Sequence, residues 1–369
     1  MIKYKILCVV FIQFLFTNLF SQNEPLKIGV VGLTHSHVHG ILNSNKSHKE
    51  FEIVGIVEPN KDLAKRYSEQ YNYSMDIVYN TIEEMIKTKK PEAVTAFGNI
   101  YDHLKIVEVC APAGIHVMVE KPLAVSLDHA KKMEKLVDKH GIHLLTNFET
   151  TWYPTNQKAY ELIQQDTIIG DLRKIVVRDG HKGPKKIGVN KEFLEWLTDP
   201  ELNGGGAITD FGCYGANLLT WIMEGKKPNS VTAITAQQQP ENNPKVDDEA
   251  IILLSYDNLV AIIQASWNWP IGRKDMEIYG LKGAIYSDNK HDLRVRTTTG
   301  YDSFDEEQME LPDRKYPYND PFVYLTSVIH GDIKTEKYDL SSLENNLIVV
   351  EILDAAIRSA QLNKTIELK

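Results

Sequence analysis

Between residues 25 and 147, short apolar runs alternate with longer amphipathic stretches. Short apolar runs that are closed by glycine, proline or polar residues are typical of buried parallel strands. The runs lie at residues 26–32, 51–57, 93–97, 116–119 and 142–146, and the stretches of helical character lie at 62–70, 82–89, 101–111 and 126–139. This alternation predicts a doubly wound α/β domain, whose parallel sheet is covered by helices on both faces.

Two of these helices carry clear end signals. Thr81 precedes the helix at 82–89 and is followed three residues later by Glu84, which is the arrangement of a capping box. Ser126 or Asp128 begins the last helix, and Gly141 ends it.

Polar residues follow the first two strands, at the edge where a doubly wound sheet binds its ligands. The turn after the first strand offers backbone N–H groups to a pyrophosphate, and Glu58 after the second strand suits the ribose hydroxyls. A carboxylate there disfavours the extra phosphate of NADP, so we expect NAD. The glycine pattern G-x-G-x-x-G is imperfect: aligned on Gly32, it has Thr34 and His37 in place of its second and third glycines. Thr34 narrows the approach to the pyrophosphate.

Three histidines alternate in this turn, at His35, His37 and His39. We expect His35 and His37 to line the phosphate turn and to donate hydrogen bonds to phosphate. A metal site and direct contact with the substrate are alternatives that the pattern leaves open. The later strand ends carry no series of His and Asp residues of the kind that builds a metal-dependent barrel, so we expect no metal.

Charge and the N-terminal segment narrow the classes of function. The 369 residues carry a formal net charge of −9, which argues against nucleic-acid binding. Lys3 and Lys5 precede an apolar run over residues 6–20 that ends at Ser21, the layout of a secretory signal peptide over residues 1–21. A membrane anchor is the alternative, but this run is shorter than the ~20 residues that span a bilayer. We expect a periplasmic or secreted protein that has no membrane contact after cleavage.

Two longer motifs resemble signatures of the Gfo/Idh/MocA family of oxidoreductases. Residues 113–124 contain the family's Glu-Lys-Pro directly after the fourth strand, in the context Ala-Gly-Ile-His-Val-Met-Val-Glu-Lys-Pro-Leu-Ala. Residues 204–214 read Gly-Gly-Gly-Ala-Ile-Thr-Asp-Phe-Gly-Cys-Tyr and are similar to a second signature, a glycine run that leads into Asp-x-Gly-x-His. Tyr214 replaces the commoner His, as in the glucose–fructose oxidoreductase branch. Further similar stretches lie at 99–103, 343–362 and 363–368, so the resemblance covers essentially the whole chain after the signal peptide.

The resemblance implies a Rossmann dinucleotide-binding domain over residues 25–147 and a substrate-binding and oligomerisation domain over residues 148–369. The second would be an α/β domain built on a large, mostly antiparallel sheet with one open face. Runs typical of strands lie there at 172–178, 230–237, 249–255, 259–267, 274–280 and 283–287. The open face commonly pairs subunits in this family, so we expect a homodimer or homotetramer. Residues 260–263 and Trp267 are candidates for that interface and equally for the core.

The motifs also imply the catalytic groups. Hydride transfer needs a group that holds the reacting hydroxyl and a base that takes its proton. Lys121 is expected to hold that oxygen and stabilise negative charge on it, and it can also share the proton. Tyr214 is the expected general acid–base, with help from Lys121. Asp210 is expected to bind a substrate hydroxyl or orient the base, with capping of the following helix as the alternative.

Other residues are assigned to the cofactor and the substrate. Glu120 is expected to orient the strand end or contact the ribose, and Pro122 to fix the turn through a bond that tends to be cis in this family. His103 and Lys121 complete the expected cofactor contacts. The expected substrate wall contains Trp152, Tyr153 and His181, with Arg178 and Trp196 as weaker candidates.

Together these features predict an exported NAD(P)-dependent oxidoreductase that acts on a sugar or a polysaccharide-derived saccharide. Because free NAD is scarce outside the cytoplasm, we expect the cofactor to be retained and recycled through oxidation, elimination or hydrolysis, and reduction. One alternative is a conventional NAD-dependent sugar dehydrogenase. Another is a non-catalytic sugar-binding protein that has lost its cofactor. The sequence does not identify the sugar.

Overall fold

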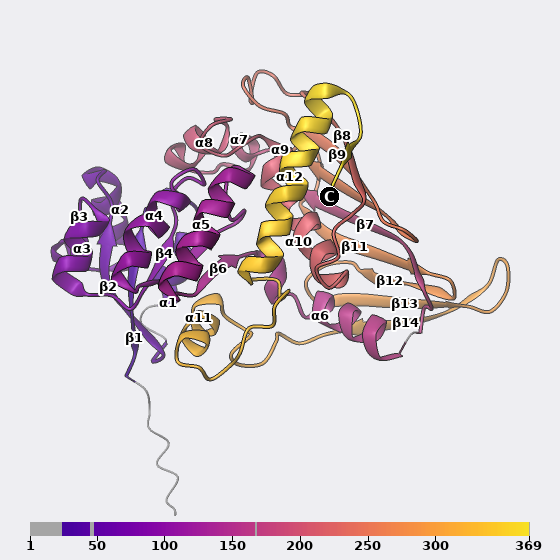
Figure 1. Cartoon of the computed structure of the whole chain (residues 1–369), viewed down its shortest axis with the longest axis horizontal. Coiled ribbons are helices and arrows are strands. Elements are labelled where there is room, and N and C mark those ends of the chain that lie inside the picture. Colours follow the sequence, from indigo (N-terminus) through magenta and orange to yellow (C-terminus); the bar gives the residue numbers. More distant parts are fainter. Residues whose placement is uncertain (1–23, 45–47, 167, 369) are drawn as a thin grey trace, which may run out of the picture.

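The computed structural model describes residues 24–44, 48–166 and 168–368, which form two domains side by side (Figure 1). The expected signal peptide, residues 1–21, lies outside the described residues. Within the described ranges, no helix combines the length and the apolar character needed to cross a membrane.

The first domain is a six-stranded parallel sheet in the order β3-β2-β1-β4-β5-β6, which confirms the predicted doubly wound fold. Its strands are β1 (Leu26–Val31), β2 (Phe51–Val57), β3 (Val78–Tyr79), β4 (Ala93–Ala96), β5 (His116–Glu120) and β6 (Leu144–Asn147). The helices are α1 (Val38–Ser44), α2 (Lys61–Tyr71), α3 (Ile82–Lys89), α4 (His103–Cys110) and α5 (Leu127–His140). The strand order reverses between β1 and β4, and a sheet of this kind binds its ligand beyond the carboxyl ends of the strands at that point.

The predicted helix ends are confirmed. Thr81 Oγ1 accepts the Glu84 amide at 3.2 Å at the start of α3. Ser126, and not Asp128, caps α5 by accepting the amide of His129. Gly141 ends α5 in the left-handed conformation.

The turn after β1 requires a glycine at its first position. Gly32 has a φ of +80°, and a Cβ there would lie 2.7 Å from the backbone nitrogen of Gly98 in the turn after β4. The absence of a side chain therefore lets the two turns pack directly against each other. In this arrangement the His35 amide donates to the Phe97 carbonyl at 2.9 Å.

The second domain contains a nine-stranded sheet in the order β14-β13-β12-β11-β7-β10-β9-β8-β15. Its strands are β7 (Leu172–Gly180), β8 (Ser230–Ala236), β9 (Glu249–Ser255), β10 (Val260–Ser266), β11 (Arg273–Gly280), β12 (Gly283–Ser287), β13 (Asp292–Thr298), β14 (Phe304–Glu310) and β15 (Ile366–Glu367). The pair β7–β10 is parallel and the other pairs are antiparallel, which confirms the predicted mostly antiparallel sheet. The charged edge strand β14 was not predicted because it has no buried face and hence no alternation of apolar residues.

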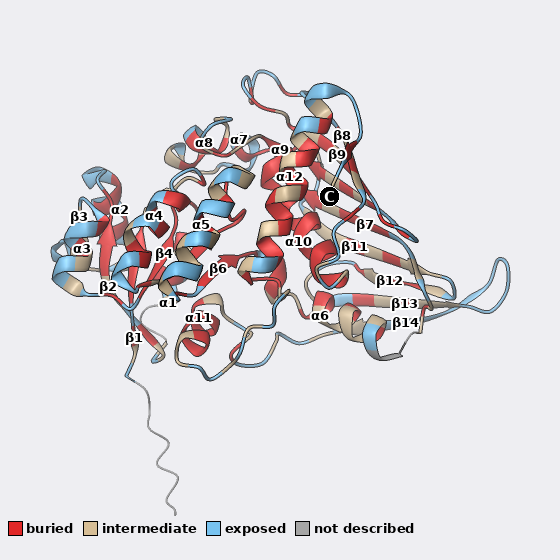
Figure 2. Cartoon of the chain, in the orientation of Figure 1, coloured by how far each residue is buried: buried red, intermediate tan, exposed pale blue. Residues whose placement is uncertain are grey.

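The helices of this domain lie against one face of the sheet and between the domains. They are α6 (Pro154–Glu161), α7 (Pro184–Ile187), α8 (Lys191–Leu197), α9 (Ala207–Asp210), α10 (Gly212–Ile222), α11 (Pro321–Ile329) and α12 (Leu343–Leu362). Ile252 and Ile263 are buried on the face that α10 and α12 cover, whereas Leu253 and Val260 are exposed on the open face (Figure 2). Trp267 is fully buried and belongs to the core.

The last two long helices join the domains. α11 returns to the first domain, where Phe322 packs edge-on against Phe51 and Phe97. α12, in yellow in Figure 1, packs against α5 of the first domain and α10 of the second. The C-terminal part of the chain therefore contributes to the contact between the domains.

Candidate active site

A buried ion pair lies where the carboxyl end of β5 meets α9. Lys121 directly follows β5, and its Nζ lies 2.5 Å from Asp210 Oδ1 and 2.9 Å from the Asp210 carbonyl oxygen. Trp267 donates its Nε1–H to Oδ2 of the same carboxylate at 2.9 Å. Because Lys121 belongs to the first domain and Asp210 to the second, this ion pair connects the two domains.

The pair keeps both of its members charged despite their burial. Burial alone would lower the pKa of Lys121, but the negative charge of Asp210 outweighs it and raises that pKa above its usual value. Burial likewise acts to raise the pKa of Asp210, and the Lys121 ammonium holds it below its usual range. Lys121 therefore presents a fixed positive charge, which suits the stabilisation of a developing alkoxide better than proton sharing.

The alternative role of Asp210 as a helix cap is wrong. Asp210 is the last residue of α9, and another carboxylate holds the start of that helix. Asp247 accepts the amides of Gly206 and Ile208 at 2.9 and 2.7 Å. Asp210 is thus left free to bind Lys121.

Glu120, the last residue of β5, is held at both of its oxygens. Asn147 Nδ2 donates to Oε1 at 2.8 Å, and His37 Nδ1 lies 2.8 Å from Oε2. These contacts agree with the expectation that Glu120 orients the strand end. Trp152 donates to Asn147 at 3.0 Å and packs against Tyr324. It supports this network, and it does not line the substrate cavity described below.

The turn after Lys121 has the expected form, with a cis peptide bond before Pro122. His103 is fully buried beneath it, and its Nδ1 lies 3.1 Å from the carbonyl oxygen of Leu123. Burial lowers the pKa of His103 to about 4, so the ring is neutral. His103 thus holds the turn from below, and its contact with a cofactor stays a prediction.

Tyr214 lies on α10 beside the ion pair. The Lys121 Nζ is 5.0 Å from the centroid of its ring, which is a cation–π contact. The help that we expect Lys121 to give to the Tyr214 hydroxyl stays a prediction. Burial raises the pKa of Tyr214 well above its usual range, so the phenol stays protonated. Its role as the general acid–base remains a prediction.

Glu58 fixes the turn after β1 from the neighbouring strand. Its two carboxylate oxygens accept the amides of Leu33 and Asn60 at 3.0 and 2.9 Å. Burial raises the pKa of this carboxyl. Since each oxygen has a second lone pair, these bonds are compatible with the expected contact to a ribose hydroxyl.

His35 and His37 lie together with Glu120, and one possible ligand atom of each lies within 4.8 Å of the others. However, His35 Nδ1 accepts the amide of His37 at 3.1 Å, and burial holds the pKa of His35 well below its usual value. A neutral ring whose Nδ1 is an acceptor carries its proton on Nε2, and a protonated nitrogen cannot bind a metal ion. The geometry therefore favours His35 as a hydrogen-bond donor.

Helix α8 of the second domain covers the turn after β1, which contains Thr34 and His35 and is called the cofactor turn below. Trp196 donates its Nε1–H to Thr34 Oγ1 at 3.0 Å, and Phe193 packs against His35 with ring centroids 4.6 Å apart. The sequence did not predict α8. Trp196, a weaker candidate for the substrate wall, lies on the cofactor turn instead.

A cavity of about 350 Å³ lies in the second domain and is lined in part by Phe211, the residue that follows Asp210. His181 and Tyr153 line it, as expected for the substrate wall, and the His181 ring packs edge-on against Phe211. The lining residues are Glu149, Tyr153, Gly180, His181, Phe211, Gly272, Arg273, Lys274, Asp288, Asn289 and Lys290. Sequence reasoning missed Glu149 and Lys274, although the position of Glu149 just after β6 was a usable signal.

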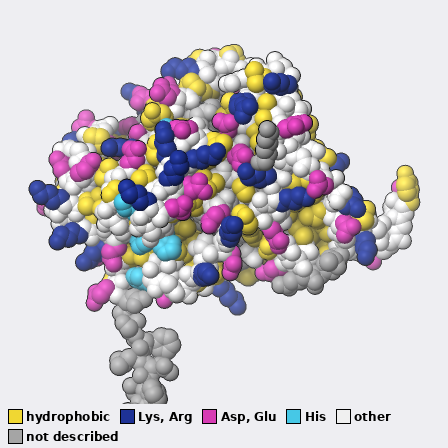
Figure 3. All heavy atoms as spheres, in the orientation of Figure 1, with side chains coloured by type: hydrophobic (Ala, Val, Ile, Leu, Met, Phe, Trp, Pro, Cys, Tyr) yellow, Lys and Arg dark blue, Asp and Glu magenta, His cyan; other side chains and the backbone are white. Residues whose placement is uncertain are grey.

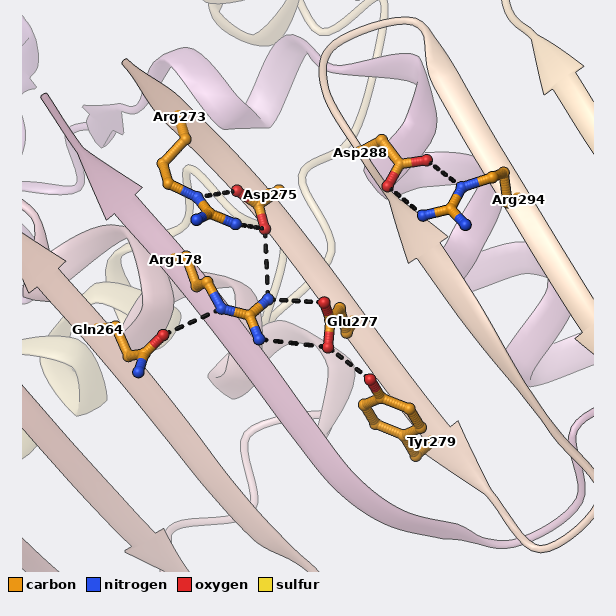
Figure 4. A network of polar contacts seen from close by, with 8 residues as sticks. All are labelled: Arg178, Gln264, Arg273, Asp275, Glu277, Tyr279, Asp288 and Arg294. Carbon is orange, nitrogen blue, oxygen red and sulfur yellow. Dashed lines mark hydrogen bonds and ion pairs between the residues drawn. The ribbon is translucent and has the colours of Figure 1, made fainter. Parts of the chain in front are cut away.

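Arg178, the other weaker candidate, does not line this cavity and belongs to the polar network on the sheet that Figure 4 shows. Its guanidinium binds Glu277 at 2.7 Å and Gln264 at 3.0 Å. Side chains alternate between the two faces of a strand, so the neighbouring residue, Asp179, points to the cavity side instead.

Asp210→Asn would leave the Lys121 ammonium buried without its counter-ion. We expect the free energy of unfolding to fall by about 3–5 kcal/mol, as measured by urea denaturation followed by circular dichroism. Asp128→Asn removes an exposed partner of Lys132 and serves as the matched control, for which we expect an unchanged midpoint. Equal midpoints for the two variants would contradict the stabilising role of the pair.

Comparison with known proteins agrees with this architecture. The NAD-binding Rossmann-fold model of the Gfo/Idh/MocA oxidoreductase family matches residues 26–148, and a C-terminal domain model of the same family matches residues 156–286. A trans-1,2-dihydrobenzene-1,2-diol dehydrogenase of Xenopus tropicalis is 25% identical over 240 residues, which cover 64% of this chain and 67% of that protein. An uncharacterized oxidoreductase of Synechocystis is 26% identical over 285 residues, 74% of each chain.

Solved structures show the same fold. An aldose–aldose oxidoreductase from Caulobacter crescentus, complexed with glycerol, has a TM-score of 0.78 at 21% identity and covers 94% of this chain and 100% of its own. GenD2 from gentamicin A biosynthesis, complexed with NAD, has a TM-score of 0.75 at 22% identity and covers 94% and 97%. Since the two family models together span more than half of the sequence, the chain belongs to the Gfo/Idh/MocA family of oxidoreductases.

Proposed function

We propose that this protein oxidises a hydroxyl group of a saccharide with a nicotinamide dinucleotide, which it retains and recycles within each turnover. The observation that carries the proposal is the buried Lys121–Asp210 pair beside the cofactor turn. A fixed ammonium at this place binds the reacting oxygen and stabilises its negative charge. The similarity to an aldose–aldose oxidoreductase and to a diol dehydrogenase supports a substrate with neighbouring hydroxyl groups.

The residues at the edge of the first sheet fit a dinucleotide. Gly32 permits close approach of backbone in the turn, and Glu58 has lone pairs left for ribose hydroxyls. Within the described residues, no hydrogen bond is recorded for the amides of Thr34 and Ser36, so they are available to phosphate oxygens. The Glu58 carboxylate favours NAD over NADP. A bound nicotinamide would supply the hydride acceptor and donor.

The side chains of this protein then orient the substrate and carry its proton. Lys121 holds the substrate oxygen, and Asp210 keeps Lys121 charged. Tyr214, whose phenol stays protonated, is the proposed proton carrier. On the face shown in Figure 3, basic and acidic side chains are interspersed, which supports a small saccharide as substrate and not a nucleic acid.

Retention of the cofactor is supported by the cover that α8 provides. A hydrogen bond from Trp196 to Thr34 and an ion pair between Arg66 and Glu192, at 2.9 Å, join α8 to the first domain. A dinucleotide in this turn would leave only when these contacts separate, which slows its release. A retained cofactor lets the enzyme work where free NAD is scarce.

The first experiment is to denature the purified protein and measure released nicotinamide dinucleotide by mass spectrometry. We expect about one NAD per chain, and loss of most of it in Trp196→Ala, with Trp196→Phe as the control that keeps an aromatic ring. Binding of added NAD without retained NAD would favour a conventional dehydrogenase. The absence of any NAD binding would contradict the proposal and favour a sugar-binding protein without a cofactor.

We also propose that the protein is exported through its N-terminal segment. Fractionation of cells that produce the full chain should place it in the periplasm or medium, shortened by about the first 21 residues, the length set by the apolar run and Ser21. Replacement of Lys3 and Lys5 by Glu should reduce export. Recovery of the unshortened chain in the cytoplasm would contradict the proposed export.

The open face of the second sheet is the proposed subunit interface. Ile234, Leu253 and Val260 are exposed there, beside the polar network of Figure 4, and contiguous apolar surface of this kind marks an interaction site. We expect a dimer or tetramer by light scattering and a monomer for Ile234→Lys combined with Leu253→Lys. Ile271→Lys, at an exposed loop position, is the control. A wild-type monomer would contradict this interface.

A further inference from the structure

Asp179 is a buried carboxyl group without a hydrogen-bond partner. It is 1% exposed, and neither of its oxygens has a partner among the described residues. Buried polar atoms in proteins are nearly always hydrogen-bonded, so an exception of this kind calls for a reason. Burial raises the pKa of Asp179 well above its usual range, which favours the neutral carboxylic acid.

The nearest cation is already bound to another carboxylate. In the sheet, Asp179 of β7 is paired with Lys274 of β11. The Lys274 ammonium, however, forms its ion pair with Glu149, which also accepts the hydroxyl of Tyr153 at 2.6 Å. Burial acts to raise the pKa of Glu149, but Lys274 outweighs it and keeps that pKa below its usual value. Lys274 thus pairs with Glu149 and leaves Asp179 without a partner among the described residues. The opposite directions of the two pKa shifts favour an ionised Glu149 and a protonated Asp179.

These groups lie next to the Lys121–Asp210 pair. The ammonium of Lys274 is 5.1 Å from the centroid of the Tyr214 ring, and that of Lys121 is 5.0 Å from the same centroid. Glu149 and Lys274 also line the cavity. The Tyr214 ring thus lies near both ammonium groups, and the proposal places one substrate in reach of both.

We propose that Glu149, Lys274 and Asp179 form a second acid–base centre, which performs the elimination between the two redox steps. This inference rests on the proposed function. Separate environments that leave one carboxyl ionised and another protonated are the usual sign of an acid and a base in one site. Glu149 is the base, Lys274 is the acid that contacts the leaving oxygen, and Asp179 is a positioning residue that acts through Lys274.

The step balances as follows. Oxidation of the hydroxyl at Lys121 would pass its hydride to a bound nicotinamide and its proton through the Tyr214 hydroxyl to solvent. Glu149 then takes the proton from the carbon next to the new carbonyl, and Lys121 stabilises the enolate. The enolate expels the neighbouring oxygen, which leaves with the electron pair of its bond to carbon and takes a proton from Lys274. Asp179 returns a proton to Lys274 and becomes its ionised partner. Transfer of the proton from Glu149 to Asp179 restores the starting state.

The proton on Asp179 can be observed without a substrate. The infrared difference spectrum between the wild type and Asp179→Asn at pH 7 should contain the C=O stretch of a protonated carboxyl. In Glu149→Gln this band should disappear, because the freed ammonium moves to Asp179 and ionises it. Glu149 is partly exposed, so this variant folds without a packing defect. Asp248→Asn, which replaces a buried carboxylate that accepts several N–H groups, is the control and should leave the band unchanged.

The outcome of this test depends on the charged groups around Asp179. The groups that act on it are Lys274 and Asp275 of β11, Glu149 after β6, and Lys121 after β5. Of these, only Lys274 changes its partner in Glu149→Gln. A wild-type spectrum without the band, or a band that persists in Glu149→Gln, would overturn the proposal.

The catalytic part is tested with a panel of methyl glycosides and methyl glycosides of uronic acids in D2O. Reduction of bound NAD is followed by absorbance, and deuterium incorporation next to the oxidised carbon by NMR. In Glu149→Gln, the ratio of deuterium incorporation to NAD reduction should fall about 10²–10⁴-fold. In Asp179→Asn, the ratio of methanol release to deuterium incorporation should fall. If the wild type reduces no NAD, the proposed function fails. If it does and Glu149→Gln still incorporates deuterium normally, this inference alone fails.

Discussion

The contact between Lys121 and Asp210 is the constraint on which the rest of the site depends. An ammonium in the interior needs an opposite charge and further hydrogen bonds, or its burial would cost several kcal/mol. The carboxylate and the carbonyl oxygen of Asp210 meet this need, and Trp267 holds the carboxylate in place by donating to its other oxygen. Because the two charged residues belong to different domains, their distance fixes the end of β5 against α9, and with it the cofactor turn against the cavity.

Hydrogen bonds and burial fix the orientation or the charge of the polar side chains around this pair. Glu120 is held between Asn147 and His37, which orients the residue before Lys121. His35 and His103 are neutral because they are buried. The positive charge near the reacting oxygen therefore comes from lysine and not from histidine, and it stays constant over the pH range in which exposed histidines titrate.

The features that depend on local sequence patterns could be predicted from the sequence. The five long strands and the caps at Thr81 and Ser126 followed from periodicity and side-chain hydrogen bonding, and the motifs around Lys121 and Asp210 identified the pair before its geometry was known. Contacts between distant segments were missed. The state of Asp179 depends on its register with Lys274, nearly a hundred residues later in the chain, and the place of Trp196 depends on how α8 crosses to the other domain. No local pattern contains that information.

The position of α11 and α12 has a consequence for how the chain acquires its structure. These helices supply Phe322 and Val350 to the two apolar clusters on the faces of the first sheet, yet they are synthesised last. The N-terminal half of the polypeptide therefore lacks part of its packing until the ribosome has completed nearly the whole chain. A polypeptide of this design stays incompletely packed during synthesis.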